Sequence, residues 1–393
     1  MRTPKFMIVA FIPFLCIRVA AAGQSEKIFK AARQAVAMMK SHPKDREAAA
    51  EAAAKRFLAD GRLLVSGSIP LFDVEWTNRS GGLMPAAALK DPESLTAADV
   101  LVYGCLLGSE EADAGRLAQA RQKGALTIAF GTKSQAARLR AKADFFLAAD
   151  IPAGTPLAAQ TAACVDLAQL WAFTGDLVAA CTRAGRMPTL WQSIKVPGST
   201  ERNRRYRPLR FHDDLSIGAV KPEVLGNQYL ESLSRSLDGL AAEGGPVRAA
   251  GKIVHAASAA KHAVFHANLG HLEPARLVPP DFPIQVTTLP QKLPEVELRN
   301  RGAAGDAVFI IWYHEMPAPL LDTAREKRLR SIVVAAQNPF APLDTSLADV
   351  YIDPKWVVGD AVVTVPGYDI KILPMSAVLN GLIFYAVIEE AAH

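Results

Sequence analysis

The strongest constraint on the fold is a series of short apolar runs that alternate with helix-forming stretches. In the first half of the chain these runs are continuously apolar, and they lie at 62–66, 100–103 and 125–130. A helix-forming stretch at 110–123 separates the last two and ends at Gly124, a residue type that often terminates helices. Continuous apolar strands between helices are typical of a parallel sheet covered on both faces. We therefore predict an α/β fold with an open parallel sheet.

A second series of runs has the same order later in the chain. Its members lie at 252–255, 307–312 and 331–335. In both series the second and third runs are separated by similar distances, with room for one helix between them, and such self-similarity indicates internal repetition. We therefore expect two tandem half-domains, related by an approximate twofold axis and flanked by helices.

The segments before and between the two series differ from them in composition. Residues 24–59 are rich in Ala, Lys, Glu and Arg and favour helix, whereas 186–226 contains several prolines and the basic run 202–207. This basic run is interpreted either as part of a solvated linker or packed loop, or as the lip of a site for an anionic ligand. The predicted division is a signal peptide at 1–22, a helical segment at 23–60, a first half-domain at 61–185, a linker at 186–226 and a second half-domain at 227–393.

The first 22 residues have the order of a secretory signal peptide. Arg2 and Lys5 precede an apolar run at 6–17, and small residues follow at 20–23. The apolar run is shorter than the roughly 20 residues that a membrane-spanning helix needs. We expect cleavage after Ala22 and export of the mature chain to the periplasm or the medium, with an uncleaved anchor as the alternative.

Composition excludes several classes of function. The 393 residues carry a formal charge of +5 from 44 basic and 39 acidic side chains, so a nucleic-acid partner is not expected. Cys105, Cys164 and Cys181 have apolar neighbours and no CxxC spacing, which predicts buried thiols rather than zinc ligands or a redox pair. No Walker loop, dinucleotide fingerprint, GxSxG or HExxH motif occurs, and no cofactor is predicted.

Two pairs of motifs resemble the SIS (sugar isomerase) phosphosugar-binding family. In the first half, LVSGS at 64–68 ends a strand in a Gly/Ser turn, and EWTNRSGGL at 75–83 carries a glutamate, an arginine and paired glycines. Near the C-terminus, GDAVV at 359–363 and LPMSAV at 373–378 are similar to the closing strand and final helix of SIS-like proteins. The resemblance covers most of 60–391 and implies two flavodoxin-like halves with a crevice for a sugar phosphate.

The candidates for ligand binding belong to turns that follow the predicted strands. In a parallel sheet, backbone amides and hydroxyl groups at these turns face the ligand. Ser258 is expected to be the second-half counterpart of Ser68, and Asn268 the counterpart of Asn78. The candidate ligand-binding residues are Ser66, Gly67, Ser68, Arg79, Ser109, Ser258 and Asn268.

Three residues are candidates for catalysis. Aldose–ketose isomerisation, which the resemblance implies, needs a base that moves a proton between neighbouring carbons. Glu75, His314 and Glu315 lie near predicted strand ends and have suitable side chains. Glu75 and Arg79 also stand four residues apart, so a simple ion pair along one helix face is the alternative.

A cluster of histidines is the only pattern that suggests a metal. His262 and His266 have helical spacing, but Glu273 is the one carboxylate near them. No metal site is predicted, and these two histidines are named only as candidate ligands.

Two functions remain open. The first is binding of a sugar or sugar phosphate between the halves, with or without isomerisation, and the second is a non-catalytic exported protein with a degenerate SIS fold for binding or assembly. The loop 104–109 offers Ser109 alone where the family places several hydroxyl groups, which favours the second, whereas Glu75 and the paired glycines favour the first. The expected partner is a small sugar derivative, with no membrane contact after signal cleavage, and a homodimer is compatible with the sequence.

Overall fold

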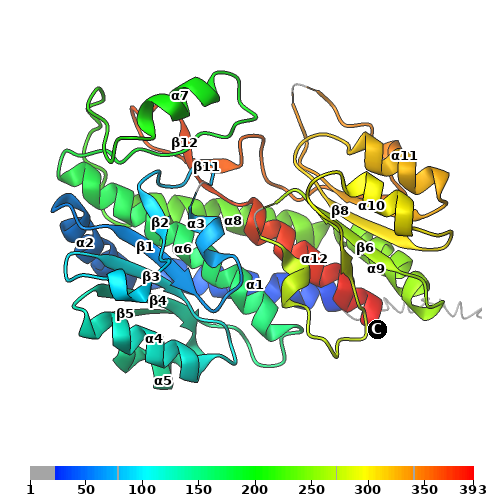
Figure 1. Cartoon of the computed structure of the whole chain (residues 1–393), viewed down its shortest axis with the longest axis horizontal. Coiled ribbons are helices and arrows are strands. Elements are labelled where there is room, and N and C mark those ends of the chain that lie inside the picture. Colours follow the sequence, from blue (N-terminus) through cyan, green and yellow to red (C-terminus); the bar gives the residue numbers. More distant parts are fainter. Residues whose placement is uncertain (1–22, 78, 271, 340) are drawn as a thin grey trace, which may run out of the picture.

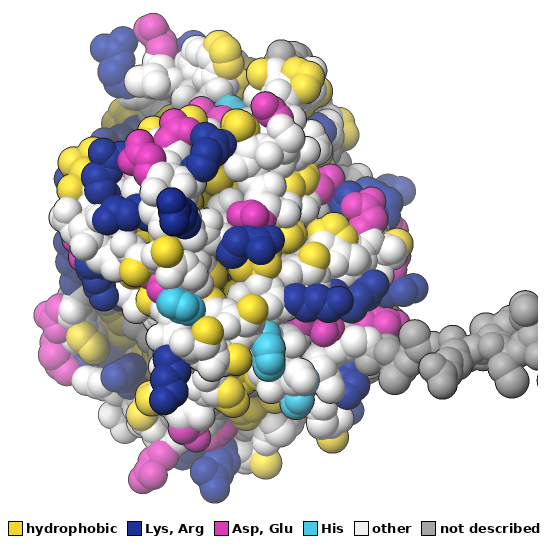
Figure 2. Space-filling view, turned by 90° about the vertical axis from the view of Figure 1, so that its right-hand side faces the viewer, with side chains coloured by type: hydrophobic (Ala, Val, Ile, Leu, Met, Phe, Trp, Pro, Cys, Tyr) yellow, Lys and Arg dark blue, Asp and Glu magenta, His cyan; other side chains and the backbone are white. Residues whose placement is uncertain are grey.

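The computed structural model describes residues 23–77, 79–270, 272–339 and 341–393. The signal peptide predicted at 1–22 and Asn78 lie outside these residues. Within them the chain forms two parallel sheets of five strands each and one antiparallel hairpin, with helices packed around both sheets (Figure 1). The predicted α/β fold class is confirmed, with two open parallel sheets in tandem along the chain. On the face shown in Figure 2, basic and acidic side chains are interspersed.

The two sheets have the same strand order. The first runs β2 (Ala86–Ala88), β1 (Leu63–Gly67), β3 (Val100–Gly104), β4 (Leu126–Thr132) and β5 (Phe145–Ala149). The second runs β7 (Thr287–Thr288), β6 (Val264–Asn268), β8 (Ala307–Ile311), β9 (Arg330–Val334) and β10 (Val350–Ile352). Leu63 pairs with Val100 in the first sheet and Val264 pairs with Ala307 in the second. Strand β6 is therefore the counterpart of β1.

The strand predicted at 252–255 is wrong, because these residues lie in helix α9 (Gly244–Ala259). The two β-branched residues at 253–254 form too short a run to distinguish a strand from one turn of a buried helix. The buried residues of α9 have the spacing of one helix face: Val247, Ala250, Gly251, Val254 and Ala257.

The helices form a central layer shared by both sheets and an outer layer on each. The outer face of the first sheet is covered by α4 (Glu110–Gln122) and α5 (Ala136–Leu139), and that of the second by α10 (Pro294–Arg301) and α11 (Ala318–Glu326). The central layer consists of α1 (Gln24–Ser41), α2 (Lys44–Leu58), α6 (Ala158–Arg183), α8 (Val224–Ala242), α9 and α12 (Ser376–Ala392). Each sheet is thus covered on both faces, as its continuous apolar strands require.

Helix α6 occupies the middle of the central layer. All its residues from Gln160 to Thr182 are buried, because β4 and β5 lie on one side and α2, α8 and α12 on the others. Among the described residues it is the one helix long and apolar enough to cross a membrane, and its apolar window is entirely buried inside the protein. Cys164 and Cys181 lie on α6 and, like Cys105, are buried free thiols, as predicted.

A buried ion pair joins four helices of the central layer. Arg46 on α2 donates from Nε to Asp176 Oδ2 on α6 at 2.6 Å, and both side chains are 2% exposed. The same guanidinium donates to the Met39 carbonyl on α1 and to Asn227 Oδ1 on α8. Asp176 also accepts from the Gly226 amide on α8. The polar groups of this pair are therefore satisfied without water.

Breaking this pair should destabilise the protein strongly. Asp176→Ala leaves the Arg46 cation buried without its partner, and we expect a loss of about 3–5 kcal/mol in the free energy of unfolding, measured by urea denaturation. The control is Asp238→Ala, which breaks the exposed Arg33–Asp238 pair and should cost less than about 1 kcal/mol. Equal effects of the two substitutions would contradict the role of the Arg46–Asp176 pair.

Candidate functional site

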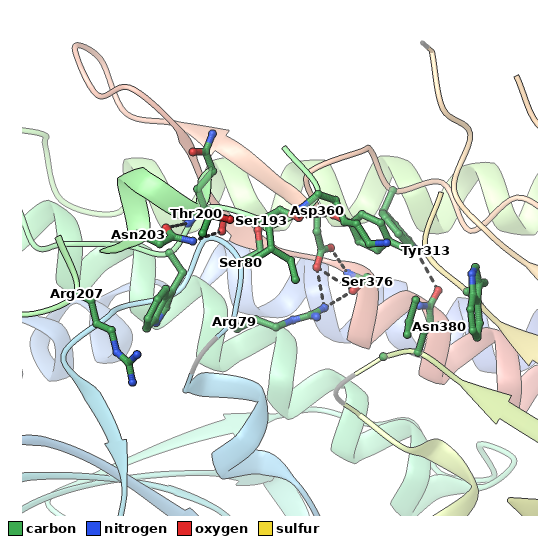
Figure 3. Close-up of a pocket in the computed structure, with 18 of the residues that line it drawn as sticks. Arg79, Ser80, Ser193, Thr200, Asn203, Arg207, Tyr313, Asp360, Ser376 and Asn380 are labelled. Carbon is green, nitrogen blue, oxygen red and sulfur yellow. Dashed lines mark hydrogen bonds and ion pairs between the residues drawn. The ribbon is translucent and has the colours of Figure 1, made fainter. Parts of the chain in front are cut away.

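A cavity of about 980 Å³ lies between the two sheets, beside helix α7 (Ser199–Tyr206) (Figure 3). Its wall is built from segments far apart in the sequence: the chain after α3 (Phe72–Trp76), the loop before α7, the turns after β6 and β8, and the start of α12. The hairpin of β11 (Ala361–Thr364) and β12 (Lys371–Pro374) connects Asp360 to that helix. The lining residues are Arg79, Ser80, Trp191, Gln192, Ser193, Ile194, Lys195, Thr200, Asn203, Arg204, Arg207, Pro208, Leu269, Gly270, Trp312, Tyr313, Trp356, Asp360, Ser376 and Asn380.

One part of the cavity wall is an ionic cluster at the N-terminus of α12. Asp360 Oδ1 accepts from the backbone amides of Met375 and Ser376, and Asp360 Oδ2 accepts from the Ser376 hydroxyl at 2.9 Å. The carboxylate therefore satisfies amides that the helix leaves unpaired and lies at the positive end of its dipole. Arg79 pairs with the same carboxylate at 2.7 Å and contacts the Ser376 hydroxyl (Figure 3).

Glu75 lies behind Arg79, away from the cavity wall. Arg79 Nε donates to Glu75 Oε1 at 3.1 Å, and Glu75 is completely buried. Burial raises the pKa of Glu75 to about 7, although the adjacent Arg79 opposes this shift. The ion pair that spacing alone suggested is thus present, but it belongs to a buried cluster of Glu75, Arg79 and Asp360 rather than to an exposed helix face.

Three further cations, Lys195, Arg204 and Arg207, line the cavity. Figure 3 shows Arg207 at the far end of the lining from the Asp360 cluster. Lys195 and Arg204 have exposed carboxylate partners, at 3.3 and 3.2 Å. Within the described residues the Arg207 side chain has no ion-pair partner. This side of the cavity is therefore suited to a negatively charged group.

Aromatic rings form a further part of the wall. Trp191, Trp312, Tyr313 and Trp356 all line the cavity, and the rings of Tyr313 and Trp356 lie 5.1 Å apart. The Trp356 indole donates to Asn380 Oδ1, which fixes both side chains. Burial raises the pKa of Tyr313 to about 12, so its hydroxyl stays protonated, and it lies 3.0 Å from Ser193 Oγ. Flat apolar faces beside hydroxyl and amide groups are typical of pockets for polar organic ligands.

The side chains of the turn after β1, which was predicted to bind the ligand, form hydrogen bonds within the protein. Ser68 Oγ accepts from the Leu106 amide at 2.7 Å and donates to Asp113 Oδ2 at 2.8 Å, so its hydrogen bonds are used within the protein. Gly67 is needed because a Cβ there would lie 2.5 Å from the Gly104 carbonyl oxygen. Of the residues described as lining the cavity, none is Ser66, Gly67, Ser68 or Ser109. The structure therefore brings Arg79 alone of the predicted ligand-binding set to the wall.

The predicted second-half counterparts are corrected by the structure. Ser258 lies in α9, so it is not the counterpart of Ser68, and the strand register makes Asn268 the counterpart of Gly67 rather than of Asn78. Asn268 accepts from the Gly270 amide and donates to the Leu272 carbonyl. Its side chain thus holds the turn whose residues Leu269 and Gly270 line the cavity.

The catalytic candidate His314 and the candidate metal ligands His262 and His266 do not belong to the described cavity lining, although the His314 ring lies 4.6 Å from that of Tyr313, which does. His314 lies in the turn after β8 and contacts Asn338, while the adjacent Glu315 reaches the rim only through Lys195. His266 is buried in β6, whereas His262 precedes the strand and lies 3.5 Å from Asp306. Their predicted common helix face is wrong, because the strand starts between them. No group of three or more potential metal ligands occurs in the described parts of the chain.

Several lining residues were missed by sequence reasoning. Asp360 and Ser376 lie within the motifs at 359–363 and 373–378, which were used only for the fold. The basic run at 202–207 did carry a signal, since Arg204 and Arg207 line the cavity. No sequence pattern indicated the aromatic lining residues, because a single Trp or Tyr in a loop cannot be distinguished from an ordinary core residue.

The buried Glu75 predicts a pH-dependent stability. Its pKa in the folded protein, about 7, is above the ordinary 4.5, so the unfolded chain ionises first as the pH rises. The free energy of unfolding should therefore fall between about pH 4.5 and 7, by a contribution on the order of 3 kcal/mol. Glu75→Gln should remove this contribution in denaturation experiments across that range, whereas the exposed Glu315→Gln should not. Parallel pH profiles for wild type and Glu75→Gln would refute the assignment.

No protein-family model matches the sequence, and no curated protein is significantly similar to it. Solved structures with the same fold do exist. A candidate sugar-binding protein from Salmonella typhimurium LT2 aligns with a TM-score of 0.55 and 12% identity over 93% of this chain and 98% of its own. A candidate phosphosugar isomerase from Silicibacter pomeroyi DSS-3 aligns with a TM-score of 0.51 and 14% identity over 94% of this chain and 97% of its own.

A candidate phosphosugar isomerase from Clostridium difficile 630 also aligns, with a TM-score of 0.51 and 10% identity over 94% of this chain and 92% of its own. Each alignment spans nearly the full length of both chains, so both sheets and the central helices are included. The chain therefore has the tandem α/β fold of SIS proteins, in agreement with the motifs at 64–68 and 75–83.

Proposed function

We propose that this protein binds a small anionic sugar derivative, a sugar phosphate or sugar acid, in the cavity between the two sheets. The observation that carries this proposal is the presence, in one cavity, of aromatic side chains together with Arg207, a cation without an ion-pair partner among the residues that the structure describes. Aromatic faces can pack on the apolar side of a sugar ring, and a guanidinium can hold a phosphate or carboxylate through two hydrogen bonds. Sugar-related functions assigned to proteins of the same fold support the same class of ligand.

The polar lining suits the hydroxyl groups of such a ligand. Ser80, Thr200 and Ser376 line the cavity together with the amide side chains of Gln192 and Asn380. The N-terminus of α12 is already occupied by the Asp360 carboxylate, so the anionic group of the ligand is better placed beside Arg207. The sugar would then lie between Arg207 and the aromatic rings.

Binding without isomerisation is the function that the geometry supports best. A catalytic base must come within hydrogen-bond distance of the proton that it removes. Glu75 is fully buried behind Arg79, and neither His314 nor Glu315 belongs to the described cavity wall. Incubation with glucose 6-phosphate, followed by NMR, should therefore yield no fructose 6-phosphate, and catalytic turnover would instead favour an isomerase.

The charge of the ligand can be tested by a thermal-shift screen and calorimetry. Glucose 6-phosphate, glucosamine 6-phosphate and galacturonic acid are compared with neutral glucose, and a ligand at roughly 100 times its Kd should stabilise the protein by about 2.7 kcal/mol. Arg207→Ala should weaken binding of the anionic ligands about tenfold or more. Arg325→Ala, on the exposed surface of α11, is the matched control and should change nothing. Equal binding of glucose and its 6-phosphate would contradict the proposal.

We also propose that the mature chain is exported, on the basis of the N-terminal pattern in the sequence. Mass spectrometry of the protein recovered from the periplasm or the medium should then find Gly23 at its N-terminus. Recovery from the cytoplasm alone, with Met1 still present, would refute export.

A further inference from the structure

A second cavity of about 990 Å³ adjoins the first. It lies between α3 and the segment that leads from β7 into α10, so it also separates the two sheets. Leu269 and Gly270 line both cavities. The turn after β6, held by Asn268, is thus the wall that the two cavities share.

The two cavities differ in charge. Among the residues described, the lining of the first includes Arg79, Lys195, Arg204 and Arg207 against the single carboxylate of Asp360. The charged groups that line the second are two arginines and two glutamates, and they form two internal pairs: Arg276 with Glu273, and Arg301 with Glu297. The first cavity is therefore suited to an anionic group, and the second to an uncharged one.

The second cavity also exposes apolar and neutral polar groups. Val74 on α3 and Leu269 are 38% and 41% exposed, and both line the second cavity. Thr288 and Gln291 add a hydroxyl and an amide, and Gln291 Nε2 lies 3.4 Å from the Gly270 carbonyl. Apolar patches beside hydroxyl and amide groups have the mixed character that the two sides of a sugar ring require.

The volumes favour a ligand larger than one sugar unit. Each cavity is by itself near the upper end of the roughly 300–1,000 Å³ that is typical of pockets for drug-sized ligands. A single hexose phosphate leaves much of the first cavity empty and does not reach the second. A ligand of two or more units can use both cavities by crossing Leu269.

We propose that the ligand is an anionic saccharide of at least two units, whose charged unit lies beside Arg207 and whose neutral unit crosses Leu269 into the second cavity. This proposal rests on the proposed binding function and specifies its substrate class. It assigns Val74, Thr288 and Gln291 to the recognition of the neutral unit, and none of these residues lines the first cavity.

The test compares one-unit with two-unit probes on the full chain. Trehalose 6-phosphate should bind at least tenfold more tightly than glucose 6-phosphate in isothermal titration calorimetry. Val74→Arg places a long charged side chain in the second cavity and should remove this advantage without changing the affinity for glucose 6-phosphate. Met38→Arg, at a comparably exposed apolar residue on α1, is the control and should leave both affinities unchanged.

Gln291→Arg provides a second variant if Val74→Arg unfolds, since Gln291 is exposed and also lines the second cavity. Equal affinity for the two probes, or an unchanged advantage in the second-cavity variant that folds, would overturn the two-unit ligand. In that case binding of glucose 6-phosphate that depends on Arg207 would leave the proposed function intact. If no anionic sugar binds at all, both proposals fail.

Discussion

Helix α6 is buried over almost its whole length, so other elements of the fold must cover it on every side. One side rests on the first sheet, and the remaining sides are covered by α2, α8 and α12, which come from before and after it in the chain. The C-terminal helix α12 in turn packs against α9, which covers the second sheet. Burial of α6 therefore requires the N-terminal segment, the C-terminal helix and the first sheet to pack around it, and α12 connects this layer to the second sheet through α9.

Two buried cations are placed within this apolar layer. Arg46 is neutralised by Asp176, and Arg79 is held by both Glu75 and Asp360. A buried charge is tolerated only where its partner and hydrogen bonds are complete, so each arginine requires the helices around it to be in place. The Arg79 cluster has an additional consequence, because it joins α3 to the start of α12 and so forms part of the cavity wall.

The two sheets pack against the shared layer of helices and not against each other, and the cavity lies where the loops beside these helices meet. The turns after β6 and β8 approach it from the second sheet, whereas the chain after α3 and the segment with α7 approach it from the other side. In such a junction no single segment contains the site. The turn after β1, which resembles a binding loop in sequence, lies outside the described cavity wall, and its Ser68 donates a hydrogen bond to Asp113 instead.

The sequence by itself determined the α/β class, the strands β1, β3, β4, β8 and β9, the helical N-terminal segment and the buried thiols, because these depend on local apolar patterns. It also pointed to Arg79 and to the basic run at 202–207, since charged residues in an otherwise apolar or Pro-rich context stand out. Only the tertiary structure decided that 252–255 is helix, because a short β-branched run suits a strand and a buried helix turn equally.

Tertiary structure likewise decided that Asp360, Ser376 and the aromatic residues share one cavity with Arg207. These residues are close together because helices more than 100 residues apart in the chain pack around α6. Local sequence patterns do not indicate such long-range contacts.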